Sequence, residues 1–172
     1  MRRQKVKGLD SMARAGIRGN VRTVFVHSMR TAVAVVASLL AARWFSLPET
    51  YWAPITTIVI TQSSLGAAFG VSWRRFMGTA VGAVLGATGA RYAGQTLPVF
   101  AVSVFVLGLL CAVAHLDRSA YRFAGVTVAI VLLIPRHGPA WQIALHRFAE
   151  VAIGIVVALI FALVWPEGKD PA

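Results

Sequence analysis

The sequence predicts an all-α integral membrane protein with six transmembrane helices. The chain has 172 residues, of which 58% are hydrophobic and 13% are charged, and its mean hydropathy is +0.71. In a soluble domain about a quarter of the residues are charged, so this chain has too few charged residues to cover a globular surface. The apolar residues fall in successive blocks separated by polar residues, which is typical of a chain that crosses a bilayer several times.

Six apolar blocks define the expected helices. Helices are preferred to strands because the blocks lack the alternation of a membrane barrel. Several blocks fall short of the ~20 residues of an ideal span, so their ends are set only to within a few residues. In chain order the blocks cover residues 24–45, 51–73, 76–92, 97–115, 121–135 and 141–165. They form a transmembrane domain over 24–166, between a basic cytoplasmic arm (1–23) and a short cytoplasmic tail (167–172).

The second block is the most informative part of the chain. Residues 51–73 contain no charged side chain, and the chain then reaches Arg74 and Arg75 before it becomes apolar again. This pattern predicts two bilayer segments joined by a basic turn. The polar run 62–64 interrupts the block and has two interpretations. It faces a polar pathway, or it ends the helix near Thr61 before a short amphipathic segment.

The basic residues predict the orientation of the helices. With the N-terminus inside, the cytoplasmic side collects the N-terminal cluster together with Arg74, Arg75, Arg118, Arg122 and Lys169. The other side keeps Arg43, Arg91, Arg136 and Arg147. This asymmetry favours both termini in the cytoplasm. The net charge of +11 therefore favours contact with anionic lipid headgroups over binding to nucleic acid.

An internal similarity links the third and sixth blocks. Arg75 is followed seven residues later by Gly82, and Arg147 by Gly154, with Phe, Ala and Val at matching positions between and after them. A tyrosine also stands near the start of the second and the fifth block. These matches favour two related units of three helices each. Because each unit has an odd number of helices, consecutive copies would be inverted in the membrane.

Small residues recur every fourth position in the same two blocks. Gly78, Gly82 and Gly86 form a ridge along the third block, and Gly154 begins a similar ridge in the sixth. Lipid offers no hydrophobic gain for helix association, so close contact over small residues must supply it. We expect these glycines to pack helices together. The functional alternative is that the ridges slide past one another during transport.

Two arginines at matching positions are candidate substrate-binding residues. Arg75 and Arg147 stand at the starts of the third and sixth blocks. Each is either an interfacial anchor with its charge among the headgroups or a cation that faces an internal cavity and attracts an organic anion. Tyr51 and Trp52 stand at a helix start, where an aromatic belt is expected, and they offer aromatic contact to a substrate.

An acidic residue shares a helix surface with the second arginine. His146, Arg147 and Glu150 are three or four residues apart, so their side chains can meet on one face. The simpler interpretation is a local ion pair that lowers the cost of both charges near the membrane. The functional one makes Glu150 a carboxylate that couples transport to protons, a frequent role of acids inside membranes.

The chain offers little for catalysis or metal binding. Its four histidines show no metal-ligand spacing, and its acids are too scattered for paired acid–base chemistry. Cys111 lies in an apolar run as a single cysteine, so it forms no disulfide within the chain. We therefore expect no enzyme activity, no metal and no cofactor.

Three stretches together resemble the fusaric acid resistance protein-like family, which is related to aromatic acid exporters. They read LPETYWAPITTIVITQSS, RRFMGTAVGAVLG and HRFAEVAIGIVVALIFALVWP, and the resemblance covers roughly 24–166. It implies a bacterial inner-membrane protein that exports organic, often aromatic, carboxylic acids and is driven by the proton gradient. Larger members carry further helices and a cytoplasmic domain. A single six-helix unit is therefore expected to form a homodimer or to pair with another membrane subunit.

Three functions remain open at this point. The first is an exporter of organic anions, in which Arg75 and Arg147 attract the carboxylate. The second is an accessory or structural membrane subunit without transport of its own. The third is a passive channel for organic anions, which would carry current without proton coupling.

Overall fold

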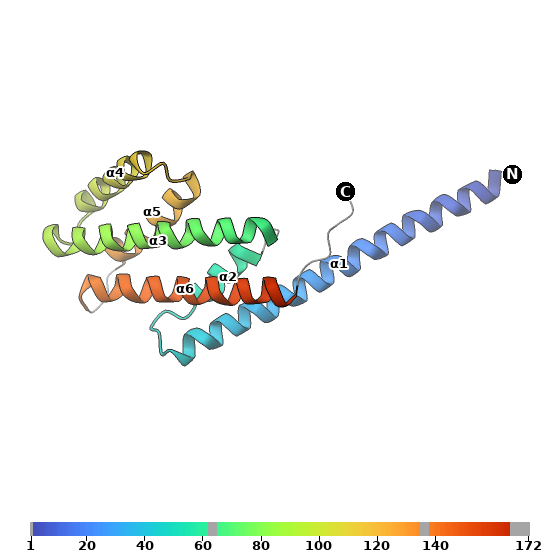
Figure 1. The fold of residues 1–172 in the computed structure, drawn as a ribbon, viewed down its shortest axis with the longest axis horizontal. Coiled ribbons are helices and arrows are strands. Elements are labelled where there is room, and N and C mark those ends of the chain that lie inside the picture. The colour runs from blue at the N-terminus through green and yellow to red at the C-terminus, as the bar shows by residue number, and fades with distance from the viewer. Residues whose placement is uncertain (1, 62–64, 135–137, 166–172) are drawn as a thin grey trace.

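Six α-helices make up the chain in the computed structural model, which describes residues 2–61, 65–134 and 138–165 (Figure 1). The described residues contain no strand. In chain order the helices are α1 (Arg2–Trp44), α2 (Trp52–Thr61), α3 (Leu65–Ala93), α4 (Leu97–Val113), α5 (Arg118–Leu133) and α6 (Ala140–Val164). The all-α class and the number of helices are therefore confirmed.

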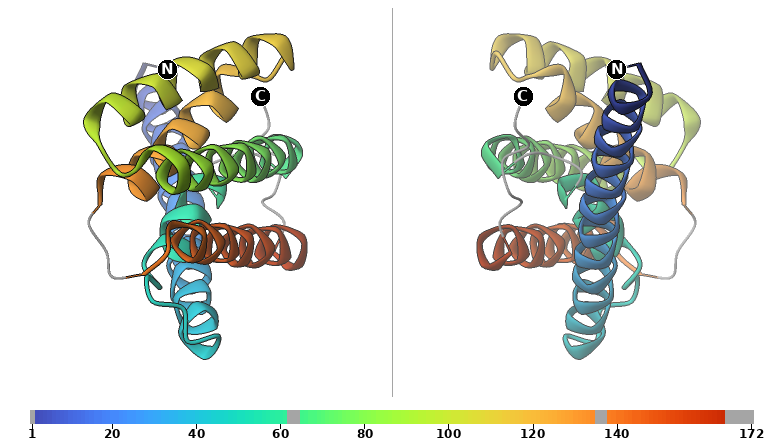
Figure 2. Two further views of the ribbon diagram at one scale, coloured as in Figure 1. Left: turned by 90° about the vertical axis from the view of Figure 1, so that its left-hand side faces the viewer. Right: turned by 90° about the vertical axis from the view of Figure 1, so that its right-hand side faces the viewer.

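The first helix joins the basic arm to the first apolar block. α1 is a single helix of 43 residues from Arg2 to Trp44, and its N-terminal part projects away from the other helices (Figures 1 and 2). At 1.5 Å per residue it is ~65 Å long, which is about twice the thickness of the hydrocarbon core. Its apolar part, Val24–Trp44, and the whole of α6 are both long and apolar enough to cross a membrane.

The second helix is much shorter than the apolar block that contains it. α2 ends at Thr61 after ten residues, which agrees with the expected end near Thr61, but the helix that follows is not a short segment, because α3 extends from Leu65 to Ala93. A helix of ten residues rises only ~15 Å, about half the hydrocarbon core, and cannot cross it alone. Residues 62–64 lie outside the described residues. The sequence predicted that each apolar block crosses the membrane. α2 is too short to do so by itself, and for the other helices the crossing stays a prediction.

The basic turn expected at Arg74 and Arg75 is wrong. α3 begins at Leu65 and passes through both arginines without a break as far as Ala93. Arginine is a good helix former, and no proline stands between the two ends of α3 to interrupt it. A pair of charges in an apolar sequence therefore marked the middle of a helix. Arg74 forms an ion pair with Asp117, which stands at the N-cap of α5.

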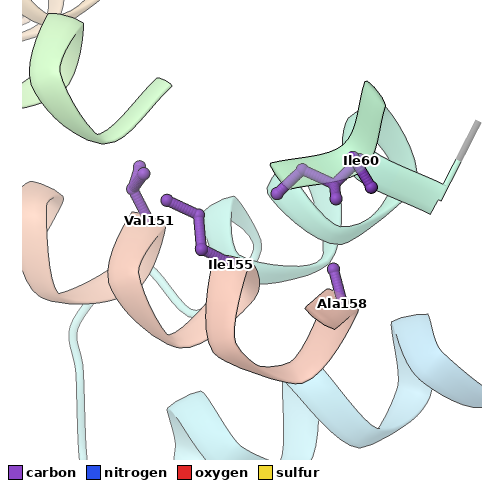
Figure 3. Packing of buried hydrophobic residues seen from close by; sticks show 5 residues of the cluster. Ile60, Val151, Ile155 and Ala158 are labelled. Atoms are coloured by element: carbon purple, nitrogen blue, oxygen red, sulfur yellow. The ribbon is translucent and has the colours of Figure 1, made fainter. Parts of the chain in front are cut away.

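Two long helices form the centre of the bundle. α3 and α6 lie side by side and run in opposite directions, α5 packs on α3, and α2 packs on α6 (Figures 1 and 2). α1 contacts α2 and α6, while α4 contacts α3 and α5. One apolar cluster lies where α2, α3 and α6 meet, and in Figure 3 Ile60 of α2 lies near Val151, Ile155 and Ala158 of α6. A second apolar cluster lies between α4 and α5 and includes Leu107 and Val128.

Close packing of the helix backbones depends on the glycines. A methyl group built on Gly78 or on Gly82 of α3 would stand 2.4 Å from a carbonyl oxygen of α5. A methyl group on Gly86 would stand 3.0 Å from Val131, and one on Gly154 of α6 would stand 2.5 Å from the carbonyl oxygen of Ala53 in α2. Each distance is shorter than an ordinary contact. The backbones therefore come closer together than any other residue type would allow without a local shift.

Candidate functional site

Two arginines are buried where the central helices pack. Arg75 of α3 is 5% exposed and Arg147 of α6 is 3% exposed. Sequence reasoning assigned them to opposite sides of the membrane and offered an anchor among the headgroups as one role for each. Both lie inside helices, and the positive charge of Arg75 acts on Arg147. Side chains this buried do not reach outward, so the anchor interpretation is wrong for both.

Arg147 lies on the face of an aromatic ring. Its guanidinium carbon is 3.6 Å from the centre of the Trp52 ring, which belongs to α2. A cation at this distance is attracted to the ring, and more strongly where water is excluded. Within the described part of the chain, Nε and Nη1 of Arg147 are buried and have no hydrogen-bond partner. The site therefore contains a buried cation with two donor nitrogens that an anion could use.

Arg75 is held more completely than Arg147. Its Nε donates a hydrogen bond of 3.1 Å to the hydroxyl oxygen of Thr56 in α2. Its guanidinium carbon lies 4.6 Å from the centre of the Phe123 ring in α5. Sequence reasoning missed both of these partners. Thr56 stands one helical turn after Trp52, which is the only local signal for it, and nothing near Phe123 pointed to an arginine on another helix.

Two glutamates complete the cluster. Glu150 is 1% exposed, and its Oε1 accepts a hydrogen bond of 3.1 Å from the backbone N–H of Glu49. The carboxylate of Glu49 accepts a bond of 2.8 Å from the indole N–H of Trp52. The charges of Glu150 and Glu49 both act on Arg147. Glu49 was also missed, although an acid three residues before Trp52 at a helix start was a usable signal.

The remaining predicted residues lie at the edge of this cluster. The Tyr51 side chain is half exposed, and its ring centre is 5.3 Å from that of Trp52 at a tilt of 42°. His146 is only partly buried, unlike Arg147 and Glu150 on the same helix. Tyr51 therefore stands between the buried charges and the surface, where a ring could meet an incoming aromatic compound.

The chemistry of the cluster is that of binding. Two buried cations, two carboxylates and aromatic faces can hold a small organic anion by charge, by hydrogen bonds and by stacking. Among the described residues, no three side chains of histidine, cysteine, aspartate or glutamate are grouped so that they could hold a metal ion. Cys111 is a free cysteine buried in the apolar cluster of α4 and α5.

The relatives of this chain among known proteins include an inner membrane protein and proteins named as transporters. The inner membrane protein YeeA of Escherichia coli strain K12 is 30% identical over 146 residues, which cover 83% of this chain and 41% of YeeA. The uncharacterized transporter YdhK of the same strain is 28% identical over 156 residues, covering 84% of this chain and 23% of YdhK. YdhK of Salmonella typhimurium strain LT2 is 27% identical over 157 residues. The chain thus spans less than half the length of these relatives, and no solved structure matches it at a significant level.

The family comparison covers most of the described bundle. The model of the fusaric acid resistance protein-like family matches residues 32–161, which run from the middle of α1 almost to the end of α6. The match includes both buried arginines, both glutamates and the four close-packed glycines. This chain belongs to the fusaric acid resistance protein-like family.

Proposed function

We propose that this chain contributes to the efflux of organic carboxylic acids, aromatic ones above all, across the bacterial inner membrane. The observation that carries the proposal is the state of Arg147. It is a buried cation on the face of Trp52 with two donor nitrogens that have no partner among the described residues. Leaving a charge in this condition is costly, so a carboxylate that accepts from these nitrogens would be bound favourably.

The surroundings of Arg147 favour a substrate with a ring. Arg147 already lies on the Trp52 ring, and Tyr51 extends the aromatic surface to the exposed edge of the cluster. A flat aromatic acid can stack on such a surface while its carboxylate meets Arg147. The second cation, Arg75, adds positive charge near the same point. Tyr51, Trp52, Arg75 and Arg147 are therefore the proposed substrate-binding residues.

Transport of a radiolabelled benzoate in proteoliposomes tests this proposal. Arg147→Ala is expected to lower its uptake at least tenfold, and Arg147→Lys is expected to retain part of it. Arg91→Ala is the matched control, because Arg91 is an exposed arginine in the last turn of α3. Equal uptake by the wild type and Arg147→Ala would refute the role of Arg147. Absence of uptake by the wild-type chain would favour an accessory subunit.

Glu150 is the proposed proton-coupling residue. It is buried, belongs to α6, and its charge acts on Arg147 three residues earlier. Loss of that negative charge on protonation makes the cluster more positive, and this would couple proton binding to anion binding. Glu150→Gln is expected to leave benzoate movement down its own gradient intact and to abolish its response to an imposed pH gradient. Wild-type currents that ignore the pH gradient would favour a passive channel.

The assembly in the membrane is also a proposal. Large apolar side chains are exposed on α1, α4 and α6, among them Phe25, Leu40, Phe105 and Leu163. Lipid would cover such surfaces at little cost. We expect the chain to form a homodimer or to pair with another membrane subunit, with both termini in the cytoplasm. Cysteine crosslinking in native membranes distinguishes a product of twice the chain mass from a mixed one.

A further inference from the structure

The pattern of helix contacts repeats between the two halves of the chain. If α1, α2 and α3 are exchanged with α4, α5 and α6, every contacting pair maps onto another contacting pair. α3 with α5 corresponds to α6 with α2, α1 with α2 to α4 with α5, and α1 with α6 to α4 with α3. α3 with α6 maps onto itself, and these two helices run in opposite directions (Figure 1). A two-fold axis perpendicular to them therefore relates the halves.

The turns that follow the first helix of each half are built alike. Ser46 and His115 both have a positive φ, of 52° and 51°, and neither is a glycine. The N–H groups of residues 46 and 47 donate to the carbonyls of 43 and 42, and those of 115 and 116 donate to 112 and 111. Each set is the pair of bonds that caps a helix end with a left-handed residue. Every position in the first turn is separated from its counterpart in the second by the same length of chain.

The close helix contacts repeat residue by residue. A methyl group on Gly82 would meet the carbonyl oxygen of Ala124 at 2.4 Å and Cβ of Thr127 at 2.9 Å. A methyl group on Gly154 would meet the carbonyl oxygen of Ala53 at 2.5 Å and Cβ of Thr56 at 2.6 Å. In both contacts the threonine follows the alanine by the same step along its helix. Chance similarity of apolar sequence does not account for matching three-dimensional contacts.

The two arginines repeat in the same way. Arg75 lies on the ring of Phe123, and Arg147 lies on the ring of Trp52. Each arginine precedes the close-packed glycine of its own helix by the same step, and each ring precedes the alanine that this glycine meets by one position. Thr56 and Thr127 each donate a hydrogen bond of 2.9 Å to the carbonyl of the aromatic residue one turn earlier. Each half therefore supplies an arginine, an aromatic ring for the other half's arginine, and a threonine.

The halves differ in the state of the arginine. Nε of Arg75 donates to the threonine of its own half, Thr56, whereas Nε of Arg147 has no partner among the described residues although Thr127 is the counterpart. We propose that the two halves exchange these states. In the alternative conformation Arg147 donates to Thr127, and Arg75 is released to bind the carboxylate. Phe123 and Thr127 thereby become site residues equivalent to Trp52 and Thr56.

The physical reason for such an exchange is the symmetry itself. Two similar halves that meet across an axis in the membrane plane can adopt each other's conformation at little cost, and this opens the shared site to the opposite side. The inference rests on the proposed function only for the identity of the anion. The exchange of the two conformations is a property of the chain and is measurable without a substrate.

Sided labelling of cysteines tests the exchange. Cys111 is the single cysteine, so Cys111→Ala gives a cysteine-free background. Into this background Tyr51→Cys or Arg122→Cys is introduced as a reporter. Both positions are exposed, and they directly precede Trp52 and Phe123. Thr56→Val weakens the conformation described here, and Thr127→Val weakens the alternative one. In proteoliposomes, an impermeant maleimide labels each reporter cysteine at a measurable rate. The ratio of the rate at position 51 to the rate at position 122 should therefore shift in opposite directions in Thr56→Val and Thr127→Val. Each shift should be about fivefold, the factor that one hydrogen bond of typical strength contributes.

Three control variants keep the result interpretable. Thr61→Val removes a buried hydroxyl whose hydrogen bonds to described residues all lie within α2. Thr56→Ser and Thr127→Ser keep the hydroxyl, so all three variants are expected to leave the ratio unchanged. Shifts in the same direction, or no shift in either valine variant, would overturn the exchange. Opposite shifts in the reporter variants, together with no benzoate uptake by the wild-type chain, would support the exchange and refute the proposed substrate. If a valine variant does not reconstitute, Arg75→Lys and Arg147→Lys replace it with the same expected opposition.

Discussion

The close approach of α3 to α5 should make Gly82 intolerant of even one added methyl group. In Gly82→Ala the new Cβ would stand 2.4 Å from the carbonyl oxygen of Ala124 and 2.9 Å from Cβ of Thr127. Ordinary contacts begin at 3.4 Å, so the two helices must separate locally to admit the methyl group. The groups that would have to move are a helix carbonyl and a β-branched side chain, and neither can turn away easily.

The size of the destabilisation follows from a comparison with a second glycine in the same pair of helices, α3 and α5. Gly125 lies on α5, and a methyl group there would meet nothing within 4 Å. Replacing glycine by alanine inside a helix stabilises it by about 1 kcal/mol, and this gain is common to both variants. The difference between them therefore isolates the overpacking cost, typically about 1–3 kcal/mol. We expect the upper end, because the obstruction is backbone.

The assay is equilibrium unfolding in mixed micelles with increasing SDS, followed by circular dichroism. Gly82→Ala is expected to have a free energy of unfolding about 3 kcal/mol below that of Gly125→Ala. Gly154→Ala should behave like Gly82→Ala, because its methyl group would meet Ala53 at 2.5 Å. If Gly82→Ala proved as stable as Gly125→Ala, the helices would not depend on these glycines for their packing.

Two further predictions concern side chains outside the glycine contacts. Trp52→Leu removes the ring under Arg147 and the hydrogen bond from the indole to Glu49. We therefore expect its free energy of unfolding to fall by about 2–4 kcal/mol in the same assay. Trp141 is exposed, so Trp141→Leu should lower it by less than about 0.5 kcal/mol. An equal effect of the two tryptophan changes would count against the cluster. Asp117→Asn breaks the pair with Arg74, but both side chains are largely exposed, so its cost should stay below about 1 kcal/mol and fall with added salt. A larger cost that salt does not change would contradict a solvent-screened pair.

Local signals predicted the helices but not the end of every helix. Apolar blocks identify α4, α5 and α6 to within a few residues, because helix formation in lipid depends on the local run of apolar side chains. Arg74 and Arg75 misled the interpretation, since charges were taken to mark a loop. In a packed bundle a charge can stay within a helix if another helix supplies its partners, and Arg75 finds Thr56 and Phe123 in this way.

The candidate site was predicted in part for the same reason. Arg147 and Glu150 were expected because charged residues are rare and costly inside a membrane, and Trp52 because aromatic residues are expected at a helix start near the interface. Glu49, Thr56 and Phe123 became visible only through contacts between helices that are distant in the chain. The correspondence of Arg75 and Arg147 was detectable in the sequence from a few identical residues at equal spacing. The correspondence of their partners on α2 and α5 was not detectable there.

The sequence by itself determined that this protein is helical, that it belongs in a membrane, and that it resembles one family, because composition and local patterns are enough for these conclusions. Only the tertiary structure decided which charges meet and which helix surfaces touch. The physical reason is that burial of a charge or a close backbone contact is a property of two helices together. In this chain that pairing joins α3 to α5 and α6 to α2, and it makes the buried arginines the centre of both halves.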